Sequence, residues 1–366
     1  ISTSGSAGAN YGVYLLTRAD GNNVTNNHIN TTGTSDNDGI EITGSNESYI
    51  FNNRINTSGT TDNDGVTATT ETWRNQIINN TITSGGSTTA NRGVNLVSNG
   101  SSTNVTGNRI TTSGTSSNFG IRISTDSQFN IIRENRVNTS GTSSANHGIY
   151  LVTRVLDNNV TDNIINTSGT STNRGIYLEI ESNETLIMNN TIFTSASSQG
   201  DDNGIRIEDN SSLANVTHNR INTSGTTDNY GVFITSGSQR NNIEYNNLTV
   251  GGSGGNNWGI SLDLNATANN ITNNFINTSG TTLNFGIRIV NNTGDSLTNW
   301  LDGNNITSFG ITATTNYAIY VDSENNVLIN NTYIREPSQW ILSGAGTTNN
   351  TFYNTTFANI NGTINF

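Results

Sequence analysis

Apolar residues recur along the chain at every second position, in short segments, and nowhere at the three-to-four residue spacing of a helix. In one segment Ile40 and Ile42 flank Glu41, and in a later one Ile121 and Ile123 flank Arg122. Alternating β-branched residues are typical of strands with one buried face. The pattern therefore predicts strands whose apolar side chains point inward, while residues such as Glu41 and Arg122 face water.

Each of these segments begins at a glycine, and the glycine returns about every 27 residues from one end of the chain to the other. The recurring positions are Gly12, Gly39, Gly65, Gly93, Gly120, Gly148, Gly175, Gly204, Gly231, Gly259 and Gly286, with Ala318 in a twelfth copy. A second segment is centred on Val24, Ile50 and Ile77, and a third begins at Ile29 and Ile55. Three short strands in each repeat predict one coil of a β-solenoid, with about twelve or thirteen coils in all.

Asparagine occupies two further positions in almost every repeat. The first column comprises Asn27, Asn53, Asn80, Asn108, Asn135, Asn163, Asn190, Asn219, Asn246, Asn274 and Asn304. The second comprises Asn10, Asn37, Asn63, Asn91, Asn118, Asn146, Asn173, Asn229, Asn257, Asn284 and Asn316, with Asp202 as its exception. Asparagine tolerates a left-handed backbone at corners, and its amide can bond to the same residue one coil away. We expect two internal asparagine ladders.

The Gly-Ile-x-Leu and Asn-Asn-x-Ile phrases resemble the right-handed parallel β-helix proteins of the pectate-lyase-like superfamily, especially repeat-rich microbial surface proteins. The resemblance implies an all-β, right-handed parallel β-helix over residues 1–334. After Ile334 the repeat pattern breaks, and it returns at Asn349-Asn350-Thr351-Phe352, so we expect residues 335–366 to form a last coil, a cap or a segment that pairs with another subunit. This superfamily includes lyases, glycoside hydrolases, epimerases, tailspikes, adhesins and structural proteins, so the fold alone does not define the activity.

The charge and composition of the chain limit the kinds of molecule that it can bind. The 366 residues carry a formal net charge of −12, contain no cysteine, and include 15 basic residues that are all arginine. The acidic balance argues against nucleic acid or an anionic membrane as partner, and no apolar run of about 18 residues could span a bilayer. The chain begins at Ile1 within a repeat, so we expect a leader removed by processing or a segment of a longer protein.

No catalytic constellation emerges from the sequence. His28, His147 and His218 share no column. In the order typical of polygalacturonases an aspartate pair precedes a Gly-His-Gly phrase, whereas here His147 precedes Asp201 and Asp202. The absence of lysine excludes a lysine-dependent lyase, although it leaves an arginine base open. We therefore expect no enzyme and no cofactor other than Ca²⁺.

Two neighbouring repeats place aspartates at one corner. Asp36 and Asp38 in one coil stack on Asp62 and Asp64 in the next. Like charges at the spacing of adjacent strands repel unless a cation screens them, and oxygen-rich clusters suit Ca²⁺. The sequence predicts a Ca²⁺ site here, with a solvated acidic corner as the alternative.

Aromatic residues fill one column near the C-terminal end. Tyr230, Trp258, Phe285 and Tyr317 each precede the recurring glycine or its alanine replacement. If the neighbouring asparagine points inward, these rings point outward, and an exposed aromatic stripe is typical of a partner surface or a glycan platform. The alternative is that the rings shield a glycine-rich corner.

Many Asn-x-Ser/Thr triplets occur in the repeats. Strand alternation predicts that eleven of them face outward and are candidates for glycosylation: Asn23, Asn30, Asn56, Asn104, Asn138, Asn159, Asn166, Asn215, Asn222, Asn270 and Asn277.

The function expected from these features is structural: an extracellular or cell-surface building block of a filament, sheath, surface layer or adhesin stalk. Its partner would be a second copy joined head to tail, with glycans as further partners. The C-terminal apolar residues Phe357, Ile360, Ile364 and Phe366 would pair with the first coil of the next subunit. The alternative is a carbohydrate-active or carbohydrate-binding β-helix, related in kind to polysaccharide lyases, hydrolases or tailspikes.

Overall fold

The computed structural model describes residues 1–6, 8–198, 200–290, 298–310, 316–334, 339–343, 350–353 and 356–358. They form two compact units, Ile1–Leu186 and Ile187–Phe366. Every strand pairing within each unit is parallel. The described residues contain no helix, and therefore no helix long and apolar enough to cross a membrane. The domain boundary that the sequence predicts after residue 334 stays a prediction.

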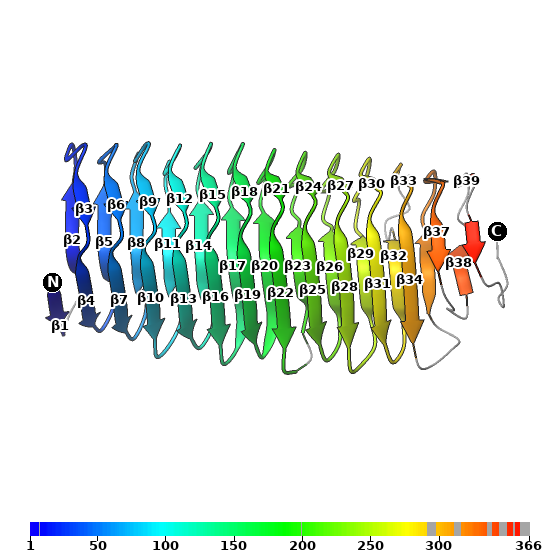
Figure 1. The fold of residues 1–366 in the computed structure, drawn as a ribbon, viewed down its shortest axis with the longest axis horizontal. Helices are drawn as coiled ribbons and strands as arrows, with labels where there is room; N and C mark the ends of the chain where they lie inside the picture. Colours follow the sequence, from blue (N-terminus) through cyan, green and yellow to red (C-terminus); the bar gives the residue numbers. More distant parts are fainter. Residues whose placement is uncertain are drawn as a thin grey trace. The chain divides into compact units, whose positions relative to one another are not determined.

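In the first unit three strands alternate along the chain, and each belongs to a different sheet (Figure 1). Sheet A contains β1 (Ser2–Gly5), β4 (His28–Gly33), β7 (Arg54–Gly59), β10 (Thr81–Gly86), β13 (Arg109–Gly114), β16 (Arg136–Gly141) and β19 (Ile164–Gly169). Sheet B contains β2 (Asn10–Leu16), β5 (Asn37–Thr43), β8 (Asp64–Thr69), β11 (Arg92–Leu96), β14 (Phe119–Ser124), β17 (Ser144–Val152) and β20 (Ser171–Glu179). Sheet C contains β3 (Asn23–Thr25), β6 (Tyr49–Phe51), β9 (Gln76–Ile78), β12 (Asn104–Thr106), β15 (Ile131–Arg133) and β18 (Asn159–Thr161).

The second unit repeats this arrangement, and β21 (Leu186–Met188) lies at the boundary. Its sheet A strands are β22 (Thr191–Ala196), β25 (Arg220–Gly225), β28 (Asn247–Gly252), β31 (Phe275–Gly280), β34 (Asn305–Gly310), β37 (Thr332–Ile334) and β40 (Thr356–Ala358). Its sheet B strands are β23 (Asp202–Ile207), β26 (Asn229–Ile234), β29 (Asn257–Leu262), β32 (Asn284–Val290), β35 (Tyr317–Asp322) and β38 (Gln339–Ser343). Its sheet C strands are β24 (Asn215–Thr217), β27 (Asn242–Glu244), β30 (Asn270–Thr272), β33 (Trp300–Asp302), β36 (Val327–Ile329) and β39 (Thr351–Tyr353). The predicted solenoid is confirmed, with three strands per coil and about twelve coils along the chain.

The core consists of the inward columns that alternation predicts. Ile40, Ile42, Ile121 and Ile123 are fully buried, because parallel register places each of them on the same position of the neighbouring coil. The recurring glycine lies where the backbone of the next coil leaves no room for a side chain. A Cβ on Gly120 would lie 2.6 Å from the carbonyl oxygen of Gly148 and would also meet the side chain of Val137.

Both predicted asparagine ladders are present. In the first unit Asn80 donates to the side-chain oxygen of Asn108 over 3.0 Å, and in the second Asn246 donates to that of Asn274 over 3.1 Å. At the other corner Asn63 donates to the side-chain oxygen of Asn91 over 2.7 Å. A third ladder precedes sheet C and was not predicted. Its side-chain amides bond along Asn130–Asn158 in the first unit and along Asn241–Asn269–Asn299–Asn326 in the second.

Candidate functional site

The outward side of sheet B in the first unit carries acidic, basic and aromatic side chains. Two columns of side chains face outward on this sheet. In each coil one column takes the residue just before the recurring glycine, and the other takes the residue two positions after it. One column contains Tyr11, Asp38, Asp64, Arg92, Phe119, His147 and Arg174. The other contains Tyr14, Glu41, Thr67, Asn95, Arg122, Tyr150 and Tyr177. We call this surface the sheet-B face.

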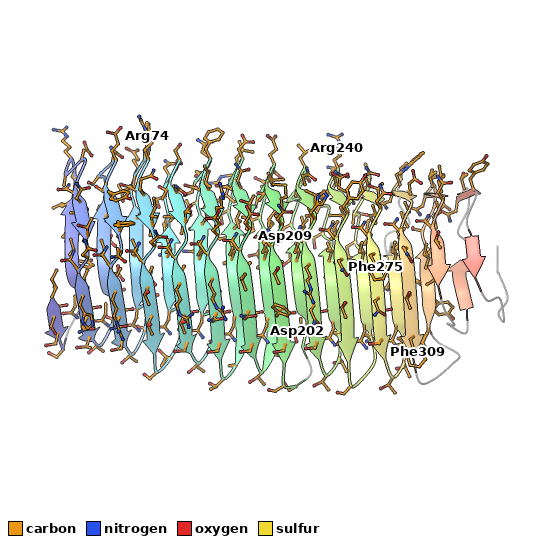
Figure 2. The ribbon with its side chains drawn as sticks, in the orientation of Figure 1. Arg74, Asp202, Asp209, Arg240, Phe275 and Phe309 are labelled. Atoms are coloured by element: carbon orange, nitrogen blue, oxygen red, sulfur yellow. The ribbon has the colours of Figure 1, made fainter. Side chains whose placement is uncertain are left out.

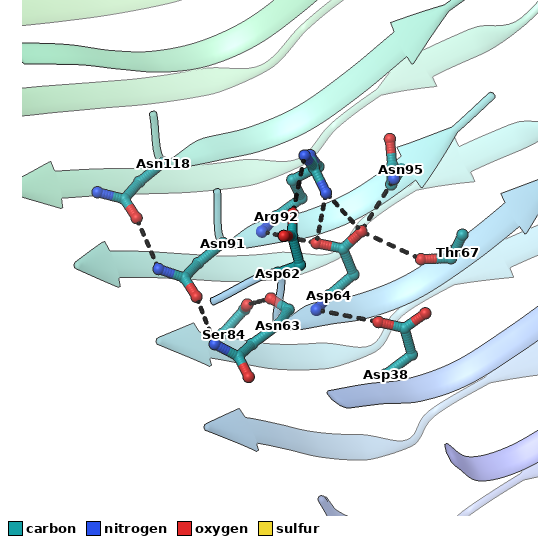
Figure 3. A network of polar contacts seen from close by, with 10 residues as sticks. All are labelled: Asp38, Asp62, Asn63, Asp64, Thr67, Ser84, Asn91, Arg92, Asn95 and Asn118. Carbon is teal, nitrogen blue, oxygen red and sulfur yellow. Dashed lines mark hydrogen bonds and ion pairs between the residues drawn. The ribbon is translucent and has the colours of Figure 1, made fainter. Parts of the chain in front are cut away.

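Carboxyl groups gather in the early coils of this face (Figure 3). Asp64 accepts hydrogen bonds from Asn95 at 2.9 Å and Thr67 at 3.2 Å, and it forms an ion pair with Arg92 at 3.1 Å. Asp38 accepts a hydrogen bond from the backbone N–H of Asp64 at 3.3 Å. The sequence placed Glu41 in water, but its side chain is buried. It lies beside Asp38 of the other outward column and accepts a hydrogen bond from the Thr43 hydroxyl at 2.8 Å.

Burial dominates the electrostatics of this cluster. It raises the pKa of Asp38 well above its usual range, and the charges of Asp64 and Glu41 raise that pKa further. Burial also raises the pKa of Asp64, whereas the Arg92 guanidinium opposes that increase. Of these two aspartates, Asp64 has a guanidinium that offsets its charge and Asp38 does not.

Aromatic and basic side chains fill the later coils of the same face. The rings of Phe119 and His147 stack with centroids 5.3 Å apart, and those of Tyr150 and Tyr177 stack at 4.9 Å. The guanidinium of Arg174 lies 4.1 Å from the centroid of the Tyr177 ring. The Tyr150 hydroxyl donates to Glu179, and burial together with that hydrogen bond raises the pKa of Tyr150 far above its usual range.

Arg122 lies within this group, in register between Asn95 and Tyr150. Its side chain is half-buried, and no carboxylate in the described part of the chain forms an ion pair with it. Burial and the positive charge of Arg92 lower the pKa of the Arg122 guanidinium, although arginine stays protonated in water. The sequence identified Arg122 only as an outward residue, and aligning its column across coils would have revealed its neighbours.

In the second unit the predicted column of Tyr230, Trp258, Phe285 and Tyr317 is a continuous ring ladder, with centroid separations of 5.0, 5.8 and 5.3 Å. The expected exposure was wrong for Tyr230, Phe285 and Tyr317, each of which has at most 9% of its surface exposed.

Side chains from the other outward column of sheet B cover this ladder. Phe233 stacks on Tyr230, Tyr320 stacks on Phe285, and the Arg288 guanidinium lies 4.2 Å from the centroid of the Trp258 ring. A role as a glycan platform stays a prediction, and Trp258 is the ring of the four that keeps more than a marginal exposed surface.

The aspartates of the predicted Ca²⁺ site separate into two environments. Asp38 and Asp64 are buried in the sheet-B face, whereas Asp36 and Asp62 lie at the preceding corner with φ angles of 48° each. Asp62 lies 3.4 Å from the Arg92 guanidinium. Within the described ranges no group of three or more His, Asp or Glu side chains has an arrangement suited to a metal ion. Ca²⁺ binding stays a prediction, and the corner pair Asp36 and Asp62 is where it is tested.

The eleven candidate glycosylation sites lie on outward strand positions and are all at least partly exposed. Some of their amides bond across coils, as in Asn56 to Asn30 at 2.9 Å and Asn166 to Asn138 at 2.8 Å. Glycosylation of these residues stays a prediction.

Among the predicted assembly residues, Phe357 belongs to β40, while Ile360, Ile364 and Phe366 lie outside the described residues. Self-association therefore stays a prediction. The three histidines are separated as expected, since His28 lies on sheet A, His147 on sheet B and His218 at the corner after β24.

Parallel sheets, three-strand coils and asparagine ladders define a parallel β-helix protein. No family model matches the sequence, and no curated protein matches it either. The A-module of the mannuronan C-5 epimerase AlgE6 from Azotobacter vinelandii has a similar structure, with a TM-score of 0.52 and 12% identity over 98% of this chain and 88% of that one.

Two further structures are similar at a TM-score of 0.46. They are the T265N mutant of the periplasmic alginate epimerase AlgG (14% identity; 88% and 78% of the two chains) and the catalytic domain of a GH87 α-1,3-glucanase (12%; 99% and 64%). At 12% identity the likeness to the AlgE6 module shows the fold of a right-handed parallel β-helix and no activity.

Proposed function

We propose that this chain binds an anionic polysaccharide on the sheet-B face of its first unit, and that Arg122 contacts a carboxylate or sulfate group of the sugar. The proposal includes an extracellular or surface location, where such polymers occur. The observation that carries it is the half-buried Arg122 guanidinium, which has no carboxylate partner in the described ranges.

An unpaired, partly desolvated cation destabilises the fold that holds it. Arginine also presents a planar set of N–H donors that matches carboxylate and sulfate oxygens. The half-buried ring of Tyr150, which stacks on the buried ring of Tyr177, lies in register with Arg122 and supplies an apolar edge beside this donor set. Sugars combine apolar C–H faces with polar groups. A carboxylated or sulfated sugar would complement both features.

The AlgE6 module, whose fold is similar, is named for action on mannuronan, a polysaccharide. This supports the carbohydrate-related alternative given by the sequence better than the structural building block that was its main expectation. We propose binding and assign no reaction, because burial and the hydrogen bond to Glu179 raise the pKa of Tyr150 and keep its hydroxyl protonated, which makes it a poor base.

The test is calorimetric titration of the intact chain with polyuronate, sulfated and neutral oligosaccharides of equal length. Arg122→Gln is expected to weaken binding of the anionic sugars by about tenfold, as loss of a charge-assisted hydrogen bond predicts. Arg240→Gln is the matched control, since Arg240 is exposed in the second unit (Figure 2), and it should change affinity by less than about twofold.

A second measurement separates function from folding. Because burial and the charge of Arg92 disfavour the charged guanidinium of Arg122, Arg122→Gln should keep or raise the melting temperature while affinity falls. Failure of the wild type to bind any anionic sugar, or equal affinity of wild type and Arg122→Gln, would overturn the proposal. Assays for unsaturated or epimerised sugar products on the same samples show whether turnover accompanies binding.

A further inference from the structure

A second surface of the first unit, on the outward side of sheet A, carries a column of positive charge. The first outward position of successive strands holds His28, Arg54, Thr81, Arg109, Arg136 and Ile164, which the parallel pairing places in direct register. All six side chains are exposed. We call these residues the sheet-A column.

The three arginines of this column have no anionic partner in the described part of the chain, although acidic residues outnumber basic ones, 27 to 15. No aspartate or glutamate occurs on strands β4, β7, β10, β13, β16 or β19. Acidic residues that precede these strands pair with other arginines: Glu134 and Asp162 lie 2.5 and 3.7 Å from Arg133 on sheet C, and Glu47 lies 3.2 Å from Arg74.

Adjacent coils of a parallel sheet are about 4.8 Å apart, so Arg109 and Arg136 lie about one such spacing apart and Arg54 about two spacings before Arg109. Like charges at this distance repel, and an anion between them relieves that repulsion. The column therefore matches a linear partner with negative charges spaced by several ångströms.

Neutral hydrogen-bonding groups run parallel to the arginines. The next outward position holds Asn30, Asn56, Thr83, Thr111, Asn138 and Asn166, and the one after it holds exposed hydroxyls at Thr32, Ser58, Ser113, Ser140 and Ser168. Flat rows of amides and hydroxyls suit a partner with many hydroxyl groups, and they offer no aromatic ring on which nucleic acid bases could stack.

We propose that the sheet-A column is a second binding surface, which takes an acidic polysaccharide chain lying across successive coils of the first unit. This site goes beyond the function proposed above, because it lies on a different sheet and does not involve Arg122. A polyanion that carries one carboxylate on each sugar and also offers hydroxyl groups matches both the arginines and the neutral rows, whereas nucleic acid finds no aromatic ring in these rows on which its bases could stack.

The experiment uses the full, unglycosylated chain, because a glycan at Asn56 or Asn138 would cover the column. The probes are polygalacturonate, neutral dextran, single-stranded DNA and vesicles containing anionic lipid. The test variant is Arg54→Gln/Arg109→Gln/Arg136→Gln in a background of Arg122→Gln, which removes the proposed sheet-B contact. The matched control is Arg18→Gln/Arg74→Gln/Arg240→Gln in the same background, which removes the same charge from exposed positions outside sheet A.

We expect the Arg122→Gln background to retain polygalacturonate binding that weakens with salt. The sheet-A triple variant should lose at least about tenfold of that affinity and the control triple less than about twofold. Equal losses in the two triples, or equal binding of DNA or vesicles, would overturn the sheet-A site as nonspecific attraction. If Arg122→Gln alone abolishes all binding, the sheet-A proposal fails while the proposed function stands; if Arg122→Gln has no effect and the sheet-A triple does, the reverse holds.

Discussion

At the scale of single residues, a column of buried threonines lines the inner side of sheet A. The hydroxyl oxygens of Thr112, Thr139 and Thr223 have no hydrogen-bond partner in the described part of the structure. At the equivalent position Ser308 donates to the carbonyl oxygen of Asn284 at 2.7 Å, and Val250 replaces the hydroxyl with a methyl group. The fold thus accepts a purely apolar side chain at this position.

Thr139→Val should therefore stabilise the chain. A buried hydroxyl without a partner costs about 1–3 kcal/mol of desolvation, so its removal is expected to raise the free energy of unfolding by about 1 kcal/mol. Urea denaturation measures the change, with Thr32→Val at an exposed outward position as the control near zero. A lower denaturation midpoint for Thr139→Val would show that the hydroxyl is satisfied.

The residue scale also explains which predictions succeeded. Inward residues such as Ile121 were predictable, because alternation and period are properties of the chain itself. Exposure of Tyr230 was not, since it depends on Phe233 folding over it from the other outward column. The lack of an ion-pair partner for Arg122 within the described residues likewise depends on neighbouring coils, which an alignment of the repeats shows and a single repeat does not.

At the scale of elements, strands β5, β8 and β11 set the electrostatics of the acidic cluster by bringing Asp38, Asp64 and Arg92 onto successive coils. Burial raises the pKa of Asp38, and the charges of Asp64 and Glu41 raise it further, so the protonated form of Asp38 is favoured in the folded state. A folded-state pKa above the unfolded one gives stability that is fully present below the unfolded pKa and is lost as the pH rises through the folded pKa.

Asp38→Asn should reduce this dependence on pH and leave the part that Asp64 and Glu41 contribute. The ordinary Asp pKa is 3.8, so wild-type stability is expected to fall as the pH rises from that value through the raised pKa of Asp38. The asparagine variant should show a flatter profile and a higher melting temperature at neutral pH. Melting curves from pH 3 to pH 8 measure the difference, and Asp20→Asn at an exposed turn position is the control. A variant that is less stable at neutral pH would contradict this.

The ladders show where element-level prediction ends. Two asparagine columns recur so regularly that corners and ladders follow from the sequence, as the Asn80–Asn108 and Asn63–Asn91 bonds confirm. The third column escaped prediction because serine or threonine replaces asparagine in several coils, as at Ser48 and Thr103. There the backbone N–H still donates to the asparagine of the next coil, so the ladder continues without a strict sequence repeat.

At the scale of the whole molecule, the net charge of −12 is spread over a chain with few cations, and self-repulsion opposes the folded state. Any salt should screen this repulsion and raise the melting temperature slightly, on the order of 1–2 °C. A bound divalent cation would add a specific term that depends on which carboxylates are present rather than on ionic strength.

The corner aspartates Asp36 and Asp62 are the residues at which specific stabilisation by Ca²⁺ is tested. Asp62 lies 3.4 Å from the Arg92 guanidinium, which already supplies positive charge, while Asp36 is exposed on the neighbouring coil. If Ca²⁺ binds at this corner, CaCl₂ should raise the melting temperature more than NaCl of equal ionic strength, and a chelator should reverse the excess. The excess should disappear in Asp36→Asn/Asp62→Asn and persist in the matched variant Asp157→Asn/Asp162→Asn, which alters two other corners of the same unit. Equal melting temperatures in the two salts would show that the Ca²⁺ prediction is wrong. The Arg92 guanidinium and hydration by water would then be what stabilises the aspartates of this corner.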